Sequence, residues 1–254
     1  MLWTLLKRGL LVGLLAGLLA GGFAFAFGEG KVQAAIDIEQ AAGDHAGALV
    51  LAHGATSGGH EEGEALVSRS GQRGGLVLAT ALYGVFVGGL FALAFAVLSG
   101  RSRSDGFGLS VRTAAAAFCA LVLLPFLKYP ANPPAVGDPD TIAQRTWLYV
   151  ALLVIGLVSL LAARRAGEAA EHADVPWRRP VVAVGTFVAL ATLAIVVLPA
   201  VDEVPASFPA DLLWSFRITS LGTQAVLWTA LGTGFGIATW RASERRSAEA
   251  VVAA

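Results

Sequence analysis

Two short proline-braced segments carry the side chains best suited to attract a metal cation. Residues 125–140 contain five prolines, and residues 202–211 contain two more. Because proline fixes φ and removes a backbone donor, both segments should be rigid and extended. Acidic side chains there would supply the negative potential that concentrates divalent cations. The candidate metal-attracting carboxylates are Asp138, Asp202, Glu203 and Asp211, with Tyr129 and Asn132 as neutral oxygens beside them.

Two cations in the same segments allow a second interpretation of these acids. Lys128 and Arg217 could each neutralise one carboxylate and so hold the two segments together. An exposed pair of that kind contributes only about 0–1 kcal/mol, although partial burial makes the loss of one partner costlier. Cation attraction and bracing therefore both remain open. Lys128, Tyr129, Asn132 and Arg217 are expected to line the path that a cation would follow.

A second set of metal-ligand types lies in a glycine-rich stretch nearer the N-terminus. His45, His53 and His60 occur there, and Glu61 and Glu62 follow the last of them. Imidazole and carboxylate together suit borderline divalent metals. The histidines are eight and seven residues apart, however, which is not the spacing of a zinc motif. Ordinary solvated loop residues are the favoured interpretation, with weak metal capture as the alternative.

Six apolar segments must position these residues. Hydrophobic residues make up 56% of the 254-residue chain and charged residues only 14%, and its mean hydropathy is +0.69. About 20 apolar residues in a helix cross the hydrocarbon core of a bilayer. We therefore predict an all-α, polytopic transmembrane helix bundle that forms a single membrane domain over residues 1–254. The predicted spans are Leu10–Phe27, Leu76–Ser99, Val111–Leu127, Trp147–Ala163, Val181–Leu198 and Leu213–Trp240.

Basic residues predict how the spans are oriented. Twelve of the eighteen Lys and Arg fall at the termini and in the second and fourth loops, and six fall on the other side. Because basic residues favour the cytoplasmic side, both termini should be cytoplasmic, in a multi-pass protein of the cell (inner) membrane. Residues 28–75 then form an extracytoplasmic loop, helical over Lys31–Ala42 and afterwards flexible and rich in His, Glu and Gly. Residues 241–254 form a cytoplasmic tail.

The first span should be retained rather than removed as a signal peptide. Its apolar run is longer than the usual signal core, and no small-x-small cleavage site follows Phe27. Gly9, Gly13, Gly17 and Gly21 recur every four residues along it and so share one face. Such a stripe lets another helix approach closely. Packing within the chain is favoured over docking of a separate membrane protein.

The predicted spans hold little that could perform chemistry. Apart from Arg112 and Arg217 near span ends, they contain no Asp, Glu, Lys, Arg or His. Proton relays usually need such groups near the midplane, so a polar path must use neutral side chains. Thr219, Thr223 and Gln224, with Ser220, are the best set, although hydrogen bonding between helices is favoured for them.

Several function classes are excluded or disfavoured by the sequence. There is no G-x-x-x-x-G-K-[ST] phosphate loop, and no base–nucleophile cluster lies near the helices. Equal numbers of basic and acidic residues argue against nucleic-acid binding. The lone Cys119 can form no internal disulfide or CxxC metal site. We expect no enzymatic activity and no tightly bound cofactor.

The proline-braced segments resemble a known family. Residues 126–139 read FLKYPANPPAVGDP, and residues 208–224 read FPADLLWSFRITSLGTQ. Both are similar to motifs of the CbtA family of probable cobalt transporters, and Gln33–Gln40 is similar to a weaker N-terminal motif of that family. The resemblance covers nearly the whole chain. It implies a cobalt uptake system linked to cobalamin supply, with a small one-span partner, CbtB, whose His-rich tail carries most of the metal-binding histidines.

The resulting hypothesis is a membrane component of a divalent-cation uptake system, in which the cation is substrate rather than cofactor. Cobalt is implied by the resemblance alone. The residues do not select a metal, because nitrogen and oxygen ligands bind nickel, copper and zinc at least as well as cobalt. The alternative is a non-transporting scaffold that positions the small His-rich partner in the bilayer. A membrane-embedded enzyme is the third and weakest interpretation.

Overall fold

The computed structural model describes residues 2–52, 69–100, 105–172 and 175–252. Across these residues the chain forms helices and no strand, as the apolar composition predicts. The helices are α1 (Leu2–Ala52), α2 (Arg69–Ser99), α3 (Gly106–Phe118), α4 (Leu124–Lys128), α5 (Ile142–Ala169), α6 (Arg178–Val197) and α7 (Ala210–Val252). The predicted all-α membrane bundle is confirmed.

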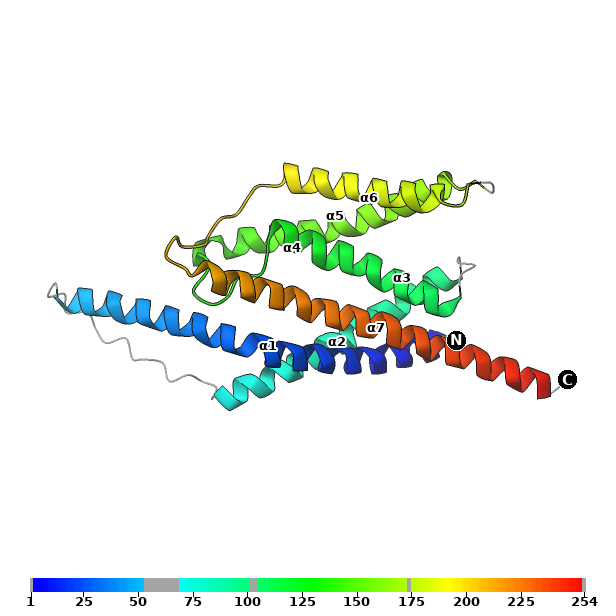
Figure 1. Cartoon of the computed structure of the whole chain (residues 1–254), viewed down its shortest axis with the longest axis horizontal. Coiled ribbons are helices and arrows are strands. Elements are labelled where there is room, and N and C mark those ends of the chain that lie inside the picture. The colour runs from blue at the N-terminus through cyan, green and yellow to red at the C-terminus, as the bar shows by residue number, and fades with distance from the viewer. Residues whose placement is uncertain (1, 53–68, 101–104, 173–174, 253–254) are drawn as a thin grey trace.

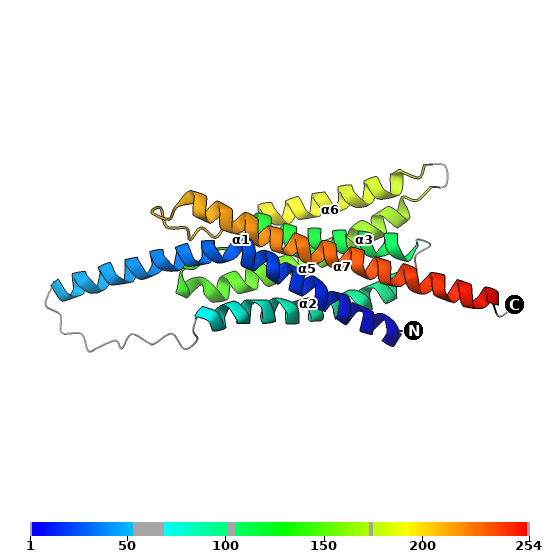
Figure 2. The same ribbon diagram turned by 60° about the horizontal axis from the view of Figure 1, so that its bottom comes forward.

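The long helices run side by side, with α7 between the α1–α2 pair and α3 (Figures 1 and 2). Helix α6 packs on α5 at the far flank of the bundle (Figure 1). Both described ends of the chain lie at the same end of the bundle, and the segments that precede α5 and α7 lie at the opposite end (Figure 1). This arrangement agrees with an even number of crossings, while the cytoplasmic placement of the termini stays a prediction.

Within the described residues, five helical stretches are long and apolar enough to cross a membrane. They lie in α1, α2, the α3–α4 region, α5 and α6. The sixth predicted span, in α7, is not among them, because glycines, threonines and Gln224 dilute its apolar residues. Helix α7 nevertheless supplies two fully buried side chains, Leu231 and Phe235, to the core. A central helix needs less lipid-facing hydrocarbon than a peripheral one, which accounts for its lower hydropathy.

The glycine stripe of α1 lies against α2. A Cβ atom added to Gly13 would lie 2.2 Å from the carbonyl oxygen of Gly84, and one added to Gly9 would lie 2.3 Å from that of Gly88. Gly17 approaches the Thr80 carbonyl oxygen in the same way, whereas a Cβ atom on Gly21 would lie 2.3 Å from the Thr80 hydroxyl oxygen. The two backbones are therefore nearly in contact, which only glycine permits. This face of α1 is occupied by a helix of the same chain.

A second close contact holds α7 in the centre of the bundle. The buried Ser110 hydroxyl of α3 donates a hydrogen bond to the Gly232 carbonyl oxygen at 2.7 Å. A Cβ atom on Gly232 would lie 2.5 Å from the Cβ of Ala114. Phe91 and Phe95 of α2 pack edge-on against Phe235, one turn further along α7. Helix α7 is thus held by both α3 and α2.

A π-helical turn over Cys119–Leu123 joins α3 to α4. Pro125 explains it, because proline cannot donate to the carbonyl four residues back and its ring clashes with that carbonyl. The backbone widens instead, and the N–H of Leu124 donates to the Cys119 carbonyl. Such π-turns often occur at functional sites. The region Gly106–Lys128 still forms one membrane span.

Helix α1 does not stop at the predicted span boundary. The expected span and the expected loop helix Lys31–Ala42 form parts of one helix that reaches Ala52. No proline interrupts it, and the Lys31 ammonium donates to the Phe27 carbonyl across the expected boundary. Ala35, which is fully buried, packs with Val136 and Phe208 from the two proline-braced segments. The extension of α1 therefore supports both segments.

The structure also bears on the predicted C-terminal tail and on the three histidines. Helix α7 continues to Val252, so most of the predicted tail is helical. The backbone of His45 belongs to the last part of α1. His53 and His60 lie outside the described residues.

Candidate functional site

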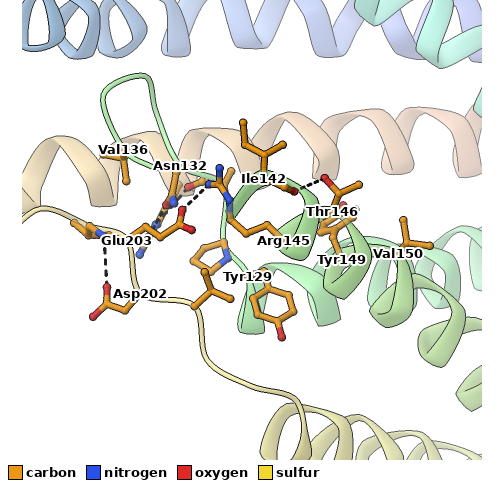
Figure 3. A pocket seen from close by; sticks show the side chains of 15 residues that line it. Tyr129, Asn132, Val136, Ile142, Arg145, Thr146, Tyr149, Val150, Asp202 and Glu203 are labelled. Atoms are coloured by element: carbon orange, nitrogen blue, oxygen red, sulfur yellow. Dashed lines mark hydrogen bonds and ion pairs between the residues drawn. The ribbon is translucent and has the colours of Figure 1, made fainter. Parts of the chain in front are cut away.

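The two proline-braced segments meet at one end of the bundle and enclose a cavity of about 610 Å³, here called the loop cavity (Figure 3). Its walls come from the segment between α4 and α5, the first turns of α5, the segment between α6 and α7, and α7 itself. Its polar side chains are Tyr129, Asn132, Arg145, Thr146, Tyr149, Asp202, Glu203 and Arg217. The two segments therefore line one cavity together.

Glu203 joins the two segments. Its Oε2 atom lies 2.7 Å from Nη1 of Arg145, and its side chain is only 8% exposed (Figure 3). The same oxygen accepts the backbone N–H of Asp138 at 3.4 Å, and Oε1 accepts the Thr141 hydroxyl. A carboxylate with three donors is held firmly in place. Glu203 therefore braces the cavity as well as lining it.

Arg145 is the functional-site residue that sequence reasoning missed. By sequence it is only one more basic residue of the outer side, because nothing local pairs it with Glu203 on a distant loop. Its position three residues into α5, directly after a proline-braced segment, is the one signal that could have pointed to it. Its Nε atom is buried and has no hydrogen-bond partner among the described residues.

Arg217 ties α7 to the other segment through neutral oxygens. Its Nη2 atom donates to Asn132 Oδ1 at 2.8 Å, and its Nε atom donates to the Ala131 carbonyl at 3.3 Å. Among the described residues, no carboxylate lies within ion-pair distance of Arg217 or of Lys128. Arg217 lines the loop cavity and Lys128 does not. Arg217 therefore forms no ion pair with a carboxylate of the described residues, although the bracing interpretation allowed one.

The remaining predicted carboxylates differ in their placement. Asp202 is exposed and lines the loop cavity, with its Oδ1 atom 3.5 Å from the backbone nitrogen of Val204. Asp138 instead accepts the Asp140 N–H at 2.9 Å in a local turn. Asp211 lies in the first turn of α7, where a negative charge favours the helix dipole. Neither of these two lines the cavity.

A smaller cavity of about 180 Å³, here called the bundle cavity, continues into the helices. It shares Tyr129, Ala131 and Tyr149 with the loop cavity, so the two adjoin each other. The Tyr129 hydroxyl donates to the Pro199 carbonyl at 2.7 Å. Burial raises the pKa of Tyr129 above its ordinary value, so this hydroxyl stays neutral. The remaining walls of the bundle cavity are Tyr83, Leu121, Val122, Phe126, Ser220, Leu221 and Gln224.

The predicted polar set of α7 divides between two faces. Ser220 and Gln224 line the bundle cavity. Gln224 interacts with the Tyr83 side chain, and its Oε1 atom is buried without a hydrogen-bond partner among the described residues. Thr219 and Thr223 donate to carbonyls of their own helix at 2.8 and 2.9 Å and do not line it. An unpartnered buried amide oxygen is costly unless water or a passing ligand satisfies it.

The residues that the structure describes bring together no group of three His, Cys, Asp or Glu side chains that could hold a metal ion. The side-chain oxygens along the two cavities are those of carboxylates, phenols, two amides, a threonine hydroxyl and a serine hydroxyl. Such oxygens coordinate a cation weakly compared with a cluster of thiolates or imidazoles. Weak, distributed ligands suit passage better than storage.

Comparison with known proteins supports one family. The family model described as a probable cobalt transporter subunit (CbtA) matches residues 2–240, nearly the whole chain. No curated protein and no solved structure gives a significant match. The match includes both proline-braced segments and every helix that lines the two cavities. The chain is a multi-pass membrane protein that belongs to the CbtA family of probable cobalt transporter subunits.

Proposed function

We propose that the chain conducts a divalent cation, cobalt by family, through the loop cavity into the bundle cavity. The observation that carries this proposal is the sharing of Tyr129, Ala131 and Tyr149 by the two cavities. Polar side chains line part of both cavities, from the proline-braced segments to Gln224. The described core is mainly apolar. Polar side chains that extend into an otherwise apolar bundle are a feature expected of a path for ions.

The direction of movement follows from the predicted orientation. With the loop cavity on the outer side, Asp202 meets the cation first and the neutral oxygens of Tyr149, Ser220 and Gln224 receive it afterwards. The membrane potential, negative inside, then favours inward movement by about 2.3 kcal/mol per charge per 100 mV. No nucleotide-binding loop is needed for such passive uptake.

A small one-span membrane protein with a His-rich tail is the proposed partner, and the inner membrane is the proposed location. Imidazoles on that partner would supply the stronger metal ligands that the described residues of this chain do not bring together. Capture by the partner and passage through this chain are then separate steps of one system.

The test compares two neighbouring residues of α7. Gln224→Leu removes the amide from the bundle cavity, whereas Thr223→Val changes a side chain that bonds only to its own helix. With the partner present, initial radiocobalt uptake should fall about tenfold for Gln224→Leu, since an oxygen that replaces a hydration oxygen is lost. Uptake should stay near wild type for Thr223→Val. Equal uptake by both variants at matched protein levels would contradict the proposed path.

A further inference from the structure

The loop cavity is lined by equal numbers of positive and negative side chains, but only one positive and one negative side chain form an ion pair. Among its described lining residues, Arg145 and Arg217 oppose Asp202 and Glu203. Arg145 and Glu203 neutralise each other at 2.7 Å. This leaves Arg217, whose hydrogen bonds go to neutral oxygens, and the exposed Asp202, whose charge acts on Arg217 from beyond ion-pair distance. The cavity therefore has one cationic and one anionic site that are both available to a ligand.

This arrangement is unfavourable for a bare divalent cation as the only occupant. An ion of charge two would enter a balanced cavity and face a guanidinium that no carboxylate contacts. Repulsion between like charges rises as water is excluded, because the effective dielectric constant falls. A cation that arrives together with an anionic ligand avoids this cost, since the complex with a dicarboxylate is neutral.

The size of the loop cavity points the same way. Its volume of about 610 Å³ is more than three times that of the bundle cavity, about 180 Å³. Sites for small organic molecules usually measure roughly 300–1,000 Å³. Tyr129 and Tyr149 give the wall the mixed apolar and polar surface that such molecules contact (Figure 3). The loop cavity thus has room for an organic ligand, whereas the bundle cavity suits a smaller species.

We infer that the loop cavity binds a small carboxylate, and that cobalt reaches it as a complex with such a carboxylate. Arg217 holds the carboxylate group, because a guanidinium fork matches its two oxygens. Arg145 places a second guanidinium on the same wall, with Glu203 as its counter-charge. Asp202 faces the metal. The inference rests on the proposed function and names the form in which the cation arrives.

The test uses the full chain in lipid nanodiscs and malonate as the probe. Calorimetric titrations are run with malonate in the presence of a metal chelator, with cobalt chloride, and with cobalt and malonate together. Wild type should bind malonate without metal, and Arg217→Gln should weaken that binding about tenfold or more, as for loss of a charge-assisted hydrogen bond. Arg179→Gln is the matched control, because Arg179 pairs with Glu171 outside both cavities.

Asp202→Asn should change the affinities for malonate and for cobalt chloride in opposite directions. Metal-free malonate should bind about two- to fivefold more tightly, because a repelling charge is removed from an open cavity. Cobalt chloride alone should bind less tightly. If malonate fails to bind wild type, or binds Arg217→Gln as well as wild type, the carboxylate site is wrong. Cobalt binding that malonate does not improve would also overturn the inference.

Arg217→Lys serves as the control for a folding defect in Arg217→Gln. It keeps the positive charge and should therefore bind malonate more tightly than Arg217→Gln does. Radiocobalt uptake in the same variants keeps the two proposals apart. If malonate does not bind but uptake still requires Gln224, the carboxylate inference fails and the proposed path stands. If malonate binds through Arg217 but uptake is indifferent to Gln224, the carboxylate site stands and the proposed path fails.

Discussion

Arg145 at the start of α5 and Glu203 in the segment between α6 and α7 are joined by an ion pair of 2.7 Å. The contact links the first turn of α5 to the segment between α6 and α7, and both line the loop cavity. Because the Glu203 side chain is 8% exposed, its charge depends on these partners rather than on water. The two residues therefore line the cavity, and their ion pair also holds its sides together.

Removing one partner of this pair should destabilise the protein. Glu203→Gln leaves the guanidinium of Arg145 partly buried without a counter-charge, at a cost of about 1–3 kcal/mol. The double variant Arg145→Met, Glu203→Leu should recover much of the loss, since an apolar pair needs no charge compensation. Thermal unfolding in detergent measures both. Arg179→Ala, which breaks an exposed pair with Glu171, serves as the control and should change stability little.

The glycine stripe of α1 makes an independent prediction about assembly. Gly13→Leu places a side chain where the Gly84 carbonyl oxygen already lies, so α1 and α2 must separate and the folded yield should fall sharply. Gly22→Leu is the matched control, because a Cβ atom there meets nothing within 4 Å. Yield is measured by size-exclusion chromatography after extraction. Equal recovery of both variants would mean that the α1–α2 contact does not stabilise the fold.

Hydropathy and proline placement predicted much of this fold, and the reasons for the misses are physical. Apolar runs predicted the helices, but not the continuation of α1 through Gly28, since glycine weakens a helix without ending it when no proline follows. The acids and cations of the two proline-braced segments allowed the possibility that ion pairs hold these segments together. The partner of Glu203 could not be predicted, because contacts between distant segments leave no local pattern. The π-turn beside Pro125 is a local consequence that only the backbone reveals.

The candidate path was also only partly predictable. A spacing of four residues places Thr219, Thr223 and Gln224 near one another on α7, but it does not say which of them faces a cavity. Thr219 faces α1, where its methyl group would lie 3.6 Å from a Cβ on Gly28. Both threonine hydroxyls bond to their own helix, as threonine in a membrane helix often does. Of these three residues, only Gln224 has a polar group left without a partner among the described residues.

The orientation of the bundle is predicted by the distribution of basic residues. In a variant with Cys119 changed to Ala, a cysteine at Ala206 should react with a membrane-impermeant thiol reagent in intact cells. A cysteine at Ser243, at the opposite end of the bundle, should react only after permeabilisation. The reverse pattern would place the loop cavity on the cytoplasmic side and turn the proposed path into one for export.

The three histidines near the end of the first loop are predicted to be dispensable for transport. Changing His45, His53 and His60 together to Ala should leave cobalt uptake within about a factor of two, as expected for weak or redundant contacts. Uptake is measured at limiting metal, where a capture role would be most visible. A large loss at normal protein level would assign metal capture to this stretch instead of to the proposed partner.

If the cation passes from the loop cavity to the bundle cavity, blocking the junction of the two cavities should stop its uptake. Ala131 lines both cavities, so a cysteine there can be modified with a bulky impermeant thiol reagent in the variant that lacks Cys119. Ala206, which lines neither cavity, carries the control cysteine. Modification at Ala131 should reduce initial radiocobalt uptake about tenfold or more, while equal modification at Ala206 should leave it unchanged. Complete modification of Ala131→Cys with undiminished uptake would contradict the proposed path.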